Sequence, residues 1–245
     1  MEQSSDDHQR LVDQYTEIAT LAGGLAHEIK NPLSTIRLNM ELLAEDFARP
    51  ENLRERRALA KILTCERECQ RLEDLLNSFL SFAKVRHVKL EPTDLNEQVA
   101  RTLDFFRPQA EESGIETISY LDPDLPSVLL DRETFHAALL NLVLNAQQAM
   151  PDGGQLVVRT RVTRFGVALD LIDTGCGMDE NTLSKIFGTF FSTKPAGSGL
   201  GLPTTRKIIE AHGGRINVQS RQGVGTQFTI ELPMLPRLTG EVEKG

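Results

Sequence analysis

The sequence predicts a helical hairpin that pairs with a second copy in a four-helix bundle, followed by an α/β sandwich domain. Two features carry this prediction. The first third of the chain places apolar residues at heptad spacing in two stretches separated by a break, which is typical of packed helices. The remainder alternates stretches rich in β-branched residues with helical stretches, which indicates separate layers of strands and helices.

The first helix of the hairpin is expected from residue 10 to residue 46. Its apolar seam places Leu11, Ile18 and Leu25 at one heptad position and Tyr15, Ala22, Ile29, Ile36 and Leu43 at the other. The stretch FARPEN, residues 47–52, ends this helix, and a second seam follows through Ile62, Cys65, Cys69, Leu72, Leu76, Phe79 and Ala83. A lone hairpin cannot bury two such seams well, so we predict a homodimer.

Strands and helices are expected to alternate after the hairpin. In order, they are a helix at 94–113, strands at 115–121 and 127–131, a helix at 133–149, strands at 154–163 and 167–173, a helix at 203–212 and a β-hairpin at 215–233. The whole chain then divides into a lead segment 1–14, the helical hairpin 15–87, a linker 88–93, the α/β domain 94–236 and a polar tail 237–245.

The composition is that of an ordinary globular protein. The chain has 245 residues, 40% of them hydrophobic, and a formal net charge of −8. This charge and the lack of a dense Lys/Arg block argue against nucleic acid as a partner. No apolar run approaches the ~18 residues of a membrane helix, so we expect no direct membrane insertion. Three cysteines form no disulfide framework, and the N-terminus lacks the order of a signal peptide, so we expect a cytoplasmic location.

The stretch GGLAHEIKNP places a histidine in the first predicted helix. His27 falls at an outward heptad position, so its imidazole faces solvent. Glu28 can accept the proton of one ring nitrogen and leave the other as a nucleophile, while Asn31 lies one turn on along the same face. Pro32 would bend the helix there and free a backbone carbonyl. An unremarkable surface histidine is the alternative, but these neighbours favour a functional one.

The second half of the chain contains residues suited to a nucleotide. Asn141 and Asn145 lie four apart on one helical face, where two amide oxygens could hold hydrated Mg²⁺, although a pair of surface asparagines is an equal alternative. Asp173 ends a predicted strand, and its carboxylate can accept a hydrogen bond from the amine of adenine. Gly175 and Gly177 follow it, which leaves room for a flat ring or simply permits a tight turn.

A second glycine-rich stretch, GSGLGLPTTRK, precedes the helix at 203–212. Gly197, Gly199 and Gly201 alternate just before this helix, where bare backbone N–H groups form a phosphate cradle. The stretch is not a P-loop, because it lacks Gly-Lys-Ser/Thr. It is not a dinucleotide-binding fingerprint either, because the glycine spacing is wrong and no predicted strand precedes it. The preceding segment KIFGTFFSTK carries three phenylalanines, which could also serve ordinary packing, and Lys194, which can reach a phosphate.

These motifs, taken in order, resemble those of sensor histidine kinases of two-component systems. HEIKNP is similar to the phosphoacceptor motif, NLVLNA to the N motif, DTGCGM to the first glycine motif, IFGTFFSTK to the F motif and GSGLGL to the second glycine motif. The resemblance covers about residues 15–236, and NAQQAMPDGGQL and FFSTK are typical of the nitrogen-regulation subfamily. It implies a dimerising phosphotransfer hairpin followed by an ATPase domain of the gyrase, heat-shock, histidine kinase and mismatch-repair type.

The resemblance also implies a reaction and its residues. His27 would be autophosphorylated from ATP with Glu28 as base, and Asn31 would position the γ-phosphate or a hydrolytic water. The phosphoryl group would pass to an aspartate of a response regulator, which the kinase would also dephosphorylate. Asp173 would contact adenine and Asn145 would bind Mg²⁺, with further nucleotide contacts from Asn141, Gly175, Gly177, Lys194, Gly197, Gly199 and Gly201.

Two other interpretations remain open from the sequence. One is an ATPase of the same fold that uses the hairpin only as a dimerising scaffold. The other is a non-enzymatic histidine phosphotransfer or coiled-coil interaction module. The intact nucleotide motifs disfavour the second, and the His27–Glu28 pair disfavours the first. If the chain is a kinase, the linker 88–93 and the segment 178–198 are expected to move when the ATPase domain meets the hairpin, within one protomer or across the dimer.

Overall fold

The computed structural model describes residues 28–84, 88–194 and 197–235. The predicted lead segment, the start of the first helix and the phosphoacceptor candidate His27 lie outside these residues, as does the predicted tail. The chain separates into a helical unit and an α/β unit, each of which is compact. No helix in the described ranges is both long and apolar enough to cross a membrane.

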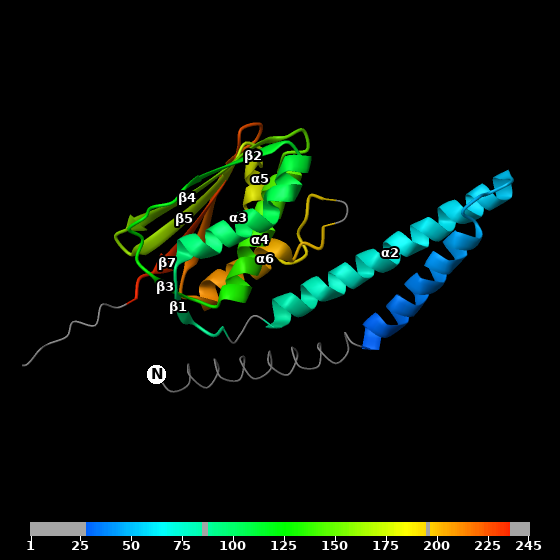
Figure 1. Cartoon of the computed structure of the whole chain (residues 1–245), viewed down its shortest axis with the longest axis horizontal. Helices are drawn as coiled ribbons and strands as arrows, with labels where there is room; N and C mark the ends of the chain where they lie inside the picture. Colours follow the sequence, from blue (N-terminus) through cyan, green and yellow to red (C-terminus); the bar gives the residue numbers. More distant parts are fainter. Residues whose placement is uncertain (1–27, 85–87, 195–196, 236–245) are drawn as a thin grey trace, which may run out of the picture. The chain divides into compact units, whose positions relative to one another are not determined.

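The helical unit is a hairpin of two helices, residues 28–46 and α2 (Leu53–Lys84) (Figure 1). Asn52 caps the second helix, because its side-chain oxygen accepts hydrogen bonds from the backbone N–H groups of Arg54 and Glu55, both at 3.0 Å. The carboxylate of Glu55 in turn accepts from the backbone N–H of Glu51. These bonds explain why the helix restarts directly after the predicted break.

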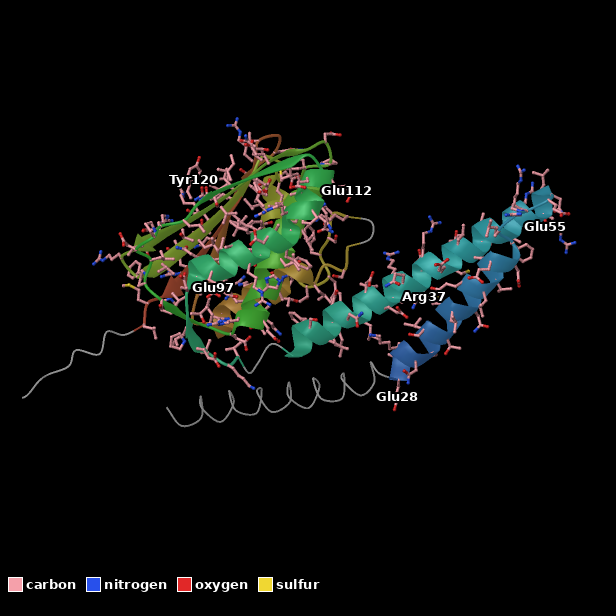
Figure 2. All side chains as sticks on the ribbon, in the orientation of Figure 1. Glu28, Arg37, Glu55, Glu97, Glu112 and Tyr120 are labelled. Carbon is pink, nitrogen blue, oxygen red and sulfur yellow. The ribbon has the colours of Figure 1, made fainter. Side chains whose placement is uncertain are left out.

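A polar contact joins the two helices of the hairpin. Glu73 on α2 is buried, and its carboxylate accepts a hydrogen bond of 3.1 Å from the hydroxyl of Ser34. Arg37, labelled in Figure 2, lies 3.7 Å from the same carboxylate and also pairs with Glu41 on its own helix. The two helices therefore meet through a polar and charged contact at Glu73.

The single hairpin leaves part of both predicted apolar seams exposed, as expected for a hairpin without a partner. Ile29, Ile36 and Leu43 of the first seam are exposed in the hairpin, as are Cys65 and Leu72 of the second. The half-buried face of the helix 28–46 consists instead of Leu33, Ser34, Arg37, Met40, Glu41 and Ala44. The two helices of one hairpin therefore pack through a different face of the first helix, and the pairing of its seam with a second copy stays a prediction.

The α/β unit contains most of the elements expected from the sequence. They are β1 (Glu91–Thr93), α3 (Leu95–Glu112), β2 (Ile115–Tyr120), β3 (Val128–Leu130), α4 (Arg132–Ala149), β4 (Gly154–Thr163), β5 (Gly166–Asp173), α5 (Glu180–Leu183), α6 (Gly201–Ala211), β6 (Arg215–Arg221) and β7 (Gly225–Pro233). Strand β1 corrects the predicted linker 88–93, since its residues pair antiparallel with β3. Only three residues long, this strand has no periodic pattern to mark it.

Five strands form one mixed sheet in the order β2-β4-β5-β7-β6. Strand β2 runs parallel to β4, and the other neighbours are antiparallel. Helices α3, α4 and α6 cover one face of this sheet (Figure 1), which gives the predicted α/β sandwich. The core between the layers is built from large side chains that include Phe106, Phe135, Leu139, Leu142, Leu156, Leu169, Ile209 and Ile230.

The opposite face of the sheet carries polar side chains. Asp170 of β5 is fully buried there, and its carboxylate accepts hydrogen bonds from Arg159, Arg161 and Thr229. Burial raises the pKa of Asp170, but these hydrogen bonds outweigh it and hold the pKa below its usual value. Tyr120 of the edge strand β2, labelled in Figure 2, is exposed. The sheet thus presents its apolar side to the helices and its charged side to solvent.

Candidate functional site

Asp173 occupies the last position of the central strand β5. Its side chain is only 6% exposed, and its Oδ1 atom accepts hydrogen bonds from the backbone N–H groups of Gly175 (2.9 Å) and Thr226 (3.2 Å). No other hydrogen bond to this carboxylate occurs within the described part of the chain, so Oδ2 remains an acceptor for a ligand. Burial raises the pKa of Asp173, and the two hydrogen bonds offset only part of that rise.

The turn after Asp173 is closely packed against two other segments. A side chain at Gly175 would place its Cβ 2.7 Å from the carbonyl oxygen of Ala149 at the end of α4. Gly177 has a positive φ of 63°, and a Cβ there would overlap the carbonyl oxygen of Arg221. Close backbone packing therefore explains why both positions need glycine, and their contact with a nucleotide stays a prediction.

Helix α4 places the two predicted asparagines beside helix α6. The Nδ2 group of Asn141 donates a hydrogen bond of 2.9 Å to the hydroxyl of Thr205. Gly201, the first residue of α6, packs against the same amide, because a Cβ there would lie 2.5 Å from the Oδ1 atom of Asn141. Asn145 is half-buried one turn further along α4. These contacts fix the start of α6 next to the asparagine face.

The remaining phosphate candidates lie in the second glycine-rich stretch, GSGLGLPTTRK, or just before it. Lys194, Gly197 and Gly199 fall within Lys194–Leu200, which groups with the helical unit, so their place beside Asp173 stays a prediction. Gly199 has a positive φ of 66°, a conformation that favours glycine. Gly201 begins α6 in the α/β unit, and Pro203 occupies its first turn as predicted.

The phenylalanines before this segment have different surroundings. Phe187 and Phe191 pack against the core of the α/β unit, so these two phenylalanines serve ordinary packing, as the sequence allowed. The guanidinium of Arg206 on α6 lies 5.5 Å from the ring centre of Phe187. Phe190 is exposed and has a positive φ of 63°, which is uncommon for a bulky residue.

Two of the predicted catalytic residues lie at the start of the first described helix. Glu28 and Asn31 are both exposed (Figure 2 labels Glu28), as an outward face requires. The helix continues through Pro32, which has no N–H group to donate to the carbonyl of Glu28. His27 directly precedes Glu28 but lies outside the described residues.

Two residues of the site were missed in the sequence. Thr226 donates its backbone N–H to Asp173, and Thr205 accepts from Asn141. A Cβ at the neighbouring Gly225, where φ is 137°, would overlap the carbonyl oxygen of Asp173. The Gly-Thr pair inside the predicted β-hairpin was a partial signal, because glycine permits close approach of two backbones but does not identify the partner strand.

Comparison with known proteins assigns the family. Residues 17–87 match the His Kinase A (phospho-acceptor) domain, and residues 130–236 match the histidine kinase-, DNA gyrase B- and HSP90-like ATPases. The chain belongs to the histidine kinases. The signal transduction histidine-protein kinase AtoS of Escherichia coli K12 is 34% identical over 94% of this chain and 37% of its own length. The sensor histidine kinase ZraS of the same strain is 33% identical over 93% and 48%.

Solved histidine kinase structures share the fold. The catalytic domain of ThkA is 31% identical with a TM-score of 0.55, over 60% of this chain and 96% of that domain. A complex of ThkA with the response regulator TrrA has 26% identity and a TM-score of 0.65, over 95% of this chain and 66% of the other. Full-length ShkA in complex with AMPPNP has 26% identity and a TM-score of 0.70, over 87% and 45%. The chain spans less than half the length of AtoS and ZraS.

Proposed function

We propose that this chain is an ATP-dependent protein-histidine kinase that phosphorylates its own His27 and passes the phosphoryl group to an aspartate of a response regulator. One observation carries the proposal: a buried carboxylate, Asp173, keeps an acceptor oxygen at the end of the central strand of a histidine kinase ATPase fold. The Oδ2 atom of this carboxylate accepts no hydrogen bond from the described residues and can accept one from a ligand donor. The exocyclic amine of adenine is such a donor.

The helices beside Asp173 are suited to the phosphates and their metal. Amide oxygens are ligands that Mg²⁺ accepts, and the hydrogen bond from Asn141 to Thr205 fixes one of the two amides on α4. Asn145 would hold the ion with Asn141 beside it, and bound Mg²⁺ would neutralise phosphate charge. The backbone N–H groups at Gly199 and Gly201, with Lys194, would bind the phosphate oxygens.

The histidine end of the reaction depends on Glu28 and Asn31. The carboxylate of Glu28 would accept a proton from His27 and so raise the nucleophilicity of the other ring nitrogen. The amide of Asn31 would orient the γ-phosphate in the forward reaction and a water during dephosphorylation of the regulator. Both side chains are exposed, so a nucleotide domain or a regulator can reach them.

The proposed partners are a second copy of the chain and a response regulator. The exposed stripe of Ile29, Ile36 and Leu43 supports a homodimer, because a second hairpin would cover it. The similarity to ThkA, which has been solved in complex with a response regulator, supports the second partner. Free cysteines Cys65 and Cys176 suit a reducing cytoplasm. The proposed domains are those expected from the sequence, except that β1 moves residues 91–93 from the linker into the α/β domain.

Incubation of the purified chain with γ-labelled ATP and Mg²⁺ separates the three candidate functions. A histidine kinase retains acid-labile, base-stable label on the protein. A scaffold ATPase releases labelled phosphate but keeps no label, and a non-enzymatic module neither binds nor hydrolyses ATP. Either of the last two results would overturn the proposal.

A further inference from the structure

His212 follows helix α6 and is held rigidly by two backbone groups. The side chain is only 3% exposed. Its Nε2 atom lies 2.9 Å from the backbone N–H of Asp131, and its Nδ1 atom lies 2.7 Å from the carbonyl oxygen of Ile208. An N–H group only donates, so Nε2 is the acceptor, and Nδ1 therefore carries the proton that is donated to Ile208. The ring of Phe135 also packs edge-on against the imidazole.

Asp131 connects this histidine to two further segments. It caps helix α4, since its Oδ1 atom accepts a hydrogen bond of 3.1 Å from the backbone N–H of Thr134. Its Oδ2 atom accepts a hydrogen bond of 2.9 Å from the backbone N–H of Lys89, in the segment that leads from the hairpin into β1. The start of α4, the end of α6 and the entering chain therefore meet at one residue.

The same two helices carry the candidate nucleotide site near the opposite end of α6. There Asn141 donates to Thr205, and Gly201 packs on the Asn141 amide. Asp131 and Asn141 are ten residues apart in the sequence, or about 15 Å along a helix. Helix α6 is thus tied to α4 at two separated points, which fixes both its distance from α4 and its position along its own axis.

We propose that Asp131 and His212 are positioning residues of the kinase, which hold the glycine-bearing start of α6 against Asn141 and anchor the entering chain at Lys89. This inference rests on the proposed function. Neither residue is placed at the nucleotide; they act through α6 and α4. A shift of α6 along its axis would move Gly201 away from the asparagine face, and the hydrogen bond at Lys89 fixes where the entering chain joins the α/β unit.

Two substitutions at His212 separate positioning from simple packing. In His212→Gln the side-chain oxygen reaches roughly where Nε2 lies and can still accept from Asp131. In His212→Asn the amide reaches only the Nδ1 position, so it can bond Ile208 but leaves the N–H of Asp131 unpaired. Both variants lose the imidazole ring and its contact with Phe135, and the melting temperature reports the packing difference of one methylene group between them.

The measurement is the affinity of the full chain for AMPPNP with Mg²⁺ by calorimetry, together with the melting temperature of each variant. We expect His212→Gln to bind within about threefold of the wild type and His212→Asn to bind roughly tenfold more weakly, a loss of ~1.4 kcal/mol. Equal affinities for the two variants, or a loss that follows the melting temperature alone, would overturn the positioning role. A wild-type chain that binds no AMPPNP would instead contradict the proposed function.

The anchor at Lys89 is tested by a backbone change. Lys89→Pro removes the N–H that bonds Asp131, whereas Lys89→Ala keeps it and removes only the side chain. We expect Lys89→Pro to lower the autophosphorylation rate at saturating ATP about tenfold with little change in AMPPNP affinity, and Lys89→Ala to match the wild type in both. Equal rates for the two variants would show that the anchor has no role in the reaction.

Discussion

At the scale of single residues, Asp173 combines a cost to the folded protein with a proposed role in nucleotide binding. The carboxylate is buried, accepts two backbone hydrogen bonds on one oxygen, and has a raised pKa. A carboxyl group with a raised pKa in the folded state contributes stability below its unfolded pKa, near 3.8, and loses it as the pH rises through the folded value. At neutral pH the ionised Asp173 therefore destabilises the empty site, and a ligand donor relieves this.

The first prediction is that Asp173→Asn weakens nucleotide binding but stabilises the empty protein. The amide oxygen can still accept from Gly175 and Thr226, while the NH₂ group replaces the acceptor meant for adenine. We expect ATP affinity to fall by about 1–3 kcal/mol, and the melting temperature at pH 7.5 to rise by roughly 2–4 °C, as ~1 kcal/mol would give. Calorimetry and thermal unfolding test the two effects.

The pH dependence provides the control for this prediction. The stability difference between the variant and the wild type should shrink as the pH falls through the raised pKa of Asp173, because the wild-type group becomes neutral there. A difference that is independent of pH, or unchanged ATP affinity in the variant, would contradict the assignment of Asp173.

The second prediction separates Glu28 from Asn31. Asn31 has an amide that can orient a water but cannot replace Glu28 as a base, so Asn31→Ala should impair dephosphorylation of the regulator more than autophosphorylation. Glu28→Ala should do the reverse, and each difference should be about tenfold or more. The assays are incorporation of labelled ATP into the kinase and loss of phosphate from a pre-phosphorylated regulator. Equal losses in both assays for both variants would mean that the two side chains support one shared geometry.

At the scale of elements, the turn after β5 depends on close backbone contact. The third prediction is that Gly177→Ala destabilises the protein by about 2 kcal/mol or more, from the left-handed backbone and the overlap with Arg221. Gly223→Ala is the matched control, because Gly223 has a φ of 75° but no atom within 4 Å of a built Cβ. It should cost only ~1 kcal/mol. Similar free energies of unfolding for the two variants would contradict the packing argument.

Most elements of the α/β unit could be predicted because the spacing of their apolar residues agreed with the capping residues at their ends. Asp94 and Asp131 are capping residues that mark the starts of α3 and α4. The alternation of buried and more exposed residues marks the strands β4 and β7. Strand β1 and the contact between Asp131 and His212 could not be predicted, since each depends on a partner far away in the chain. Asp173 could be identified from the sequence. The hydrogen bond that it accepts from Thr226 could not, because that contact depends on the register of β5 against β7.

At the scale of the whole molecule, the exposed stripe of the first helix predicts association. Ile29, Ile36 and Leu43 lie seven residues apart and stay exposed in the hairpin. The fourth prediction is that Ile36→Lys weakens dimerisation tenfold or more, since a charge would enter an apolar interface. Leu38→Lys is the control, because Leu38 is as exposed but lies outside the stripe, on the face of Asn31. Analytical ultracentrifugation measures the dimer affinity of both variants, and equal affinities would contradict a dimer interface at this stripe.

The central claim is that ATP held at Asp173 phosphorylates His27 of this chain. The most direct measurement is acid-labile, base-stable label from γ-labelled ATP on the wild type, on His27→Gln, and on His136→Gln, which alters a half-buried histidine of α4 bonded to Thr102. We expect label on the wild type and His136→Gln and its complete loss in His27→Gln. Label that persists in His27→Gln would contradict the claim.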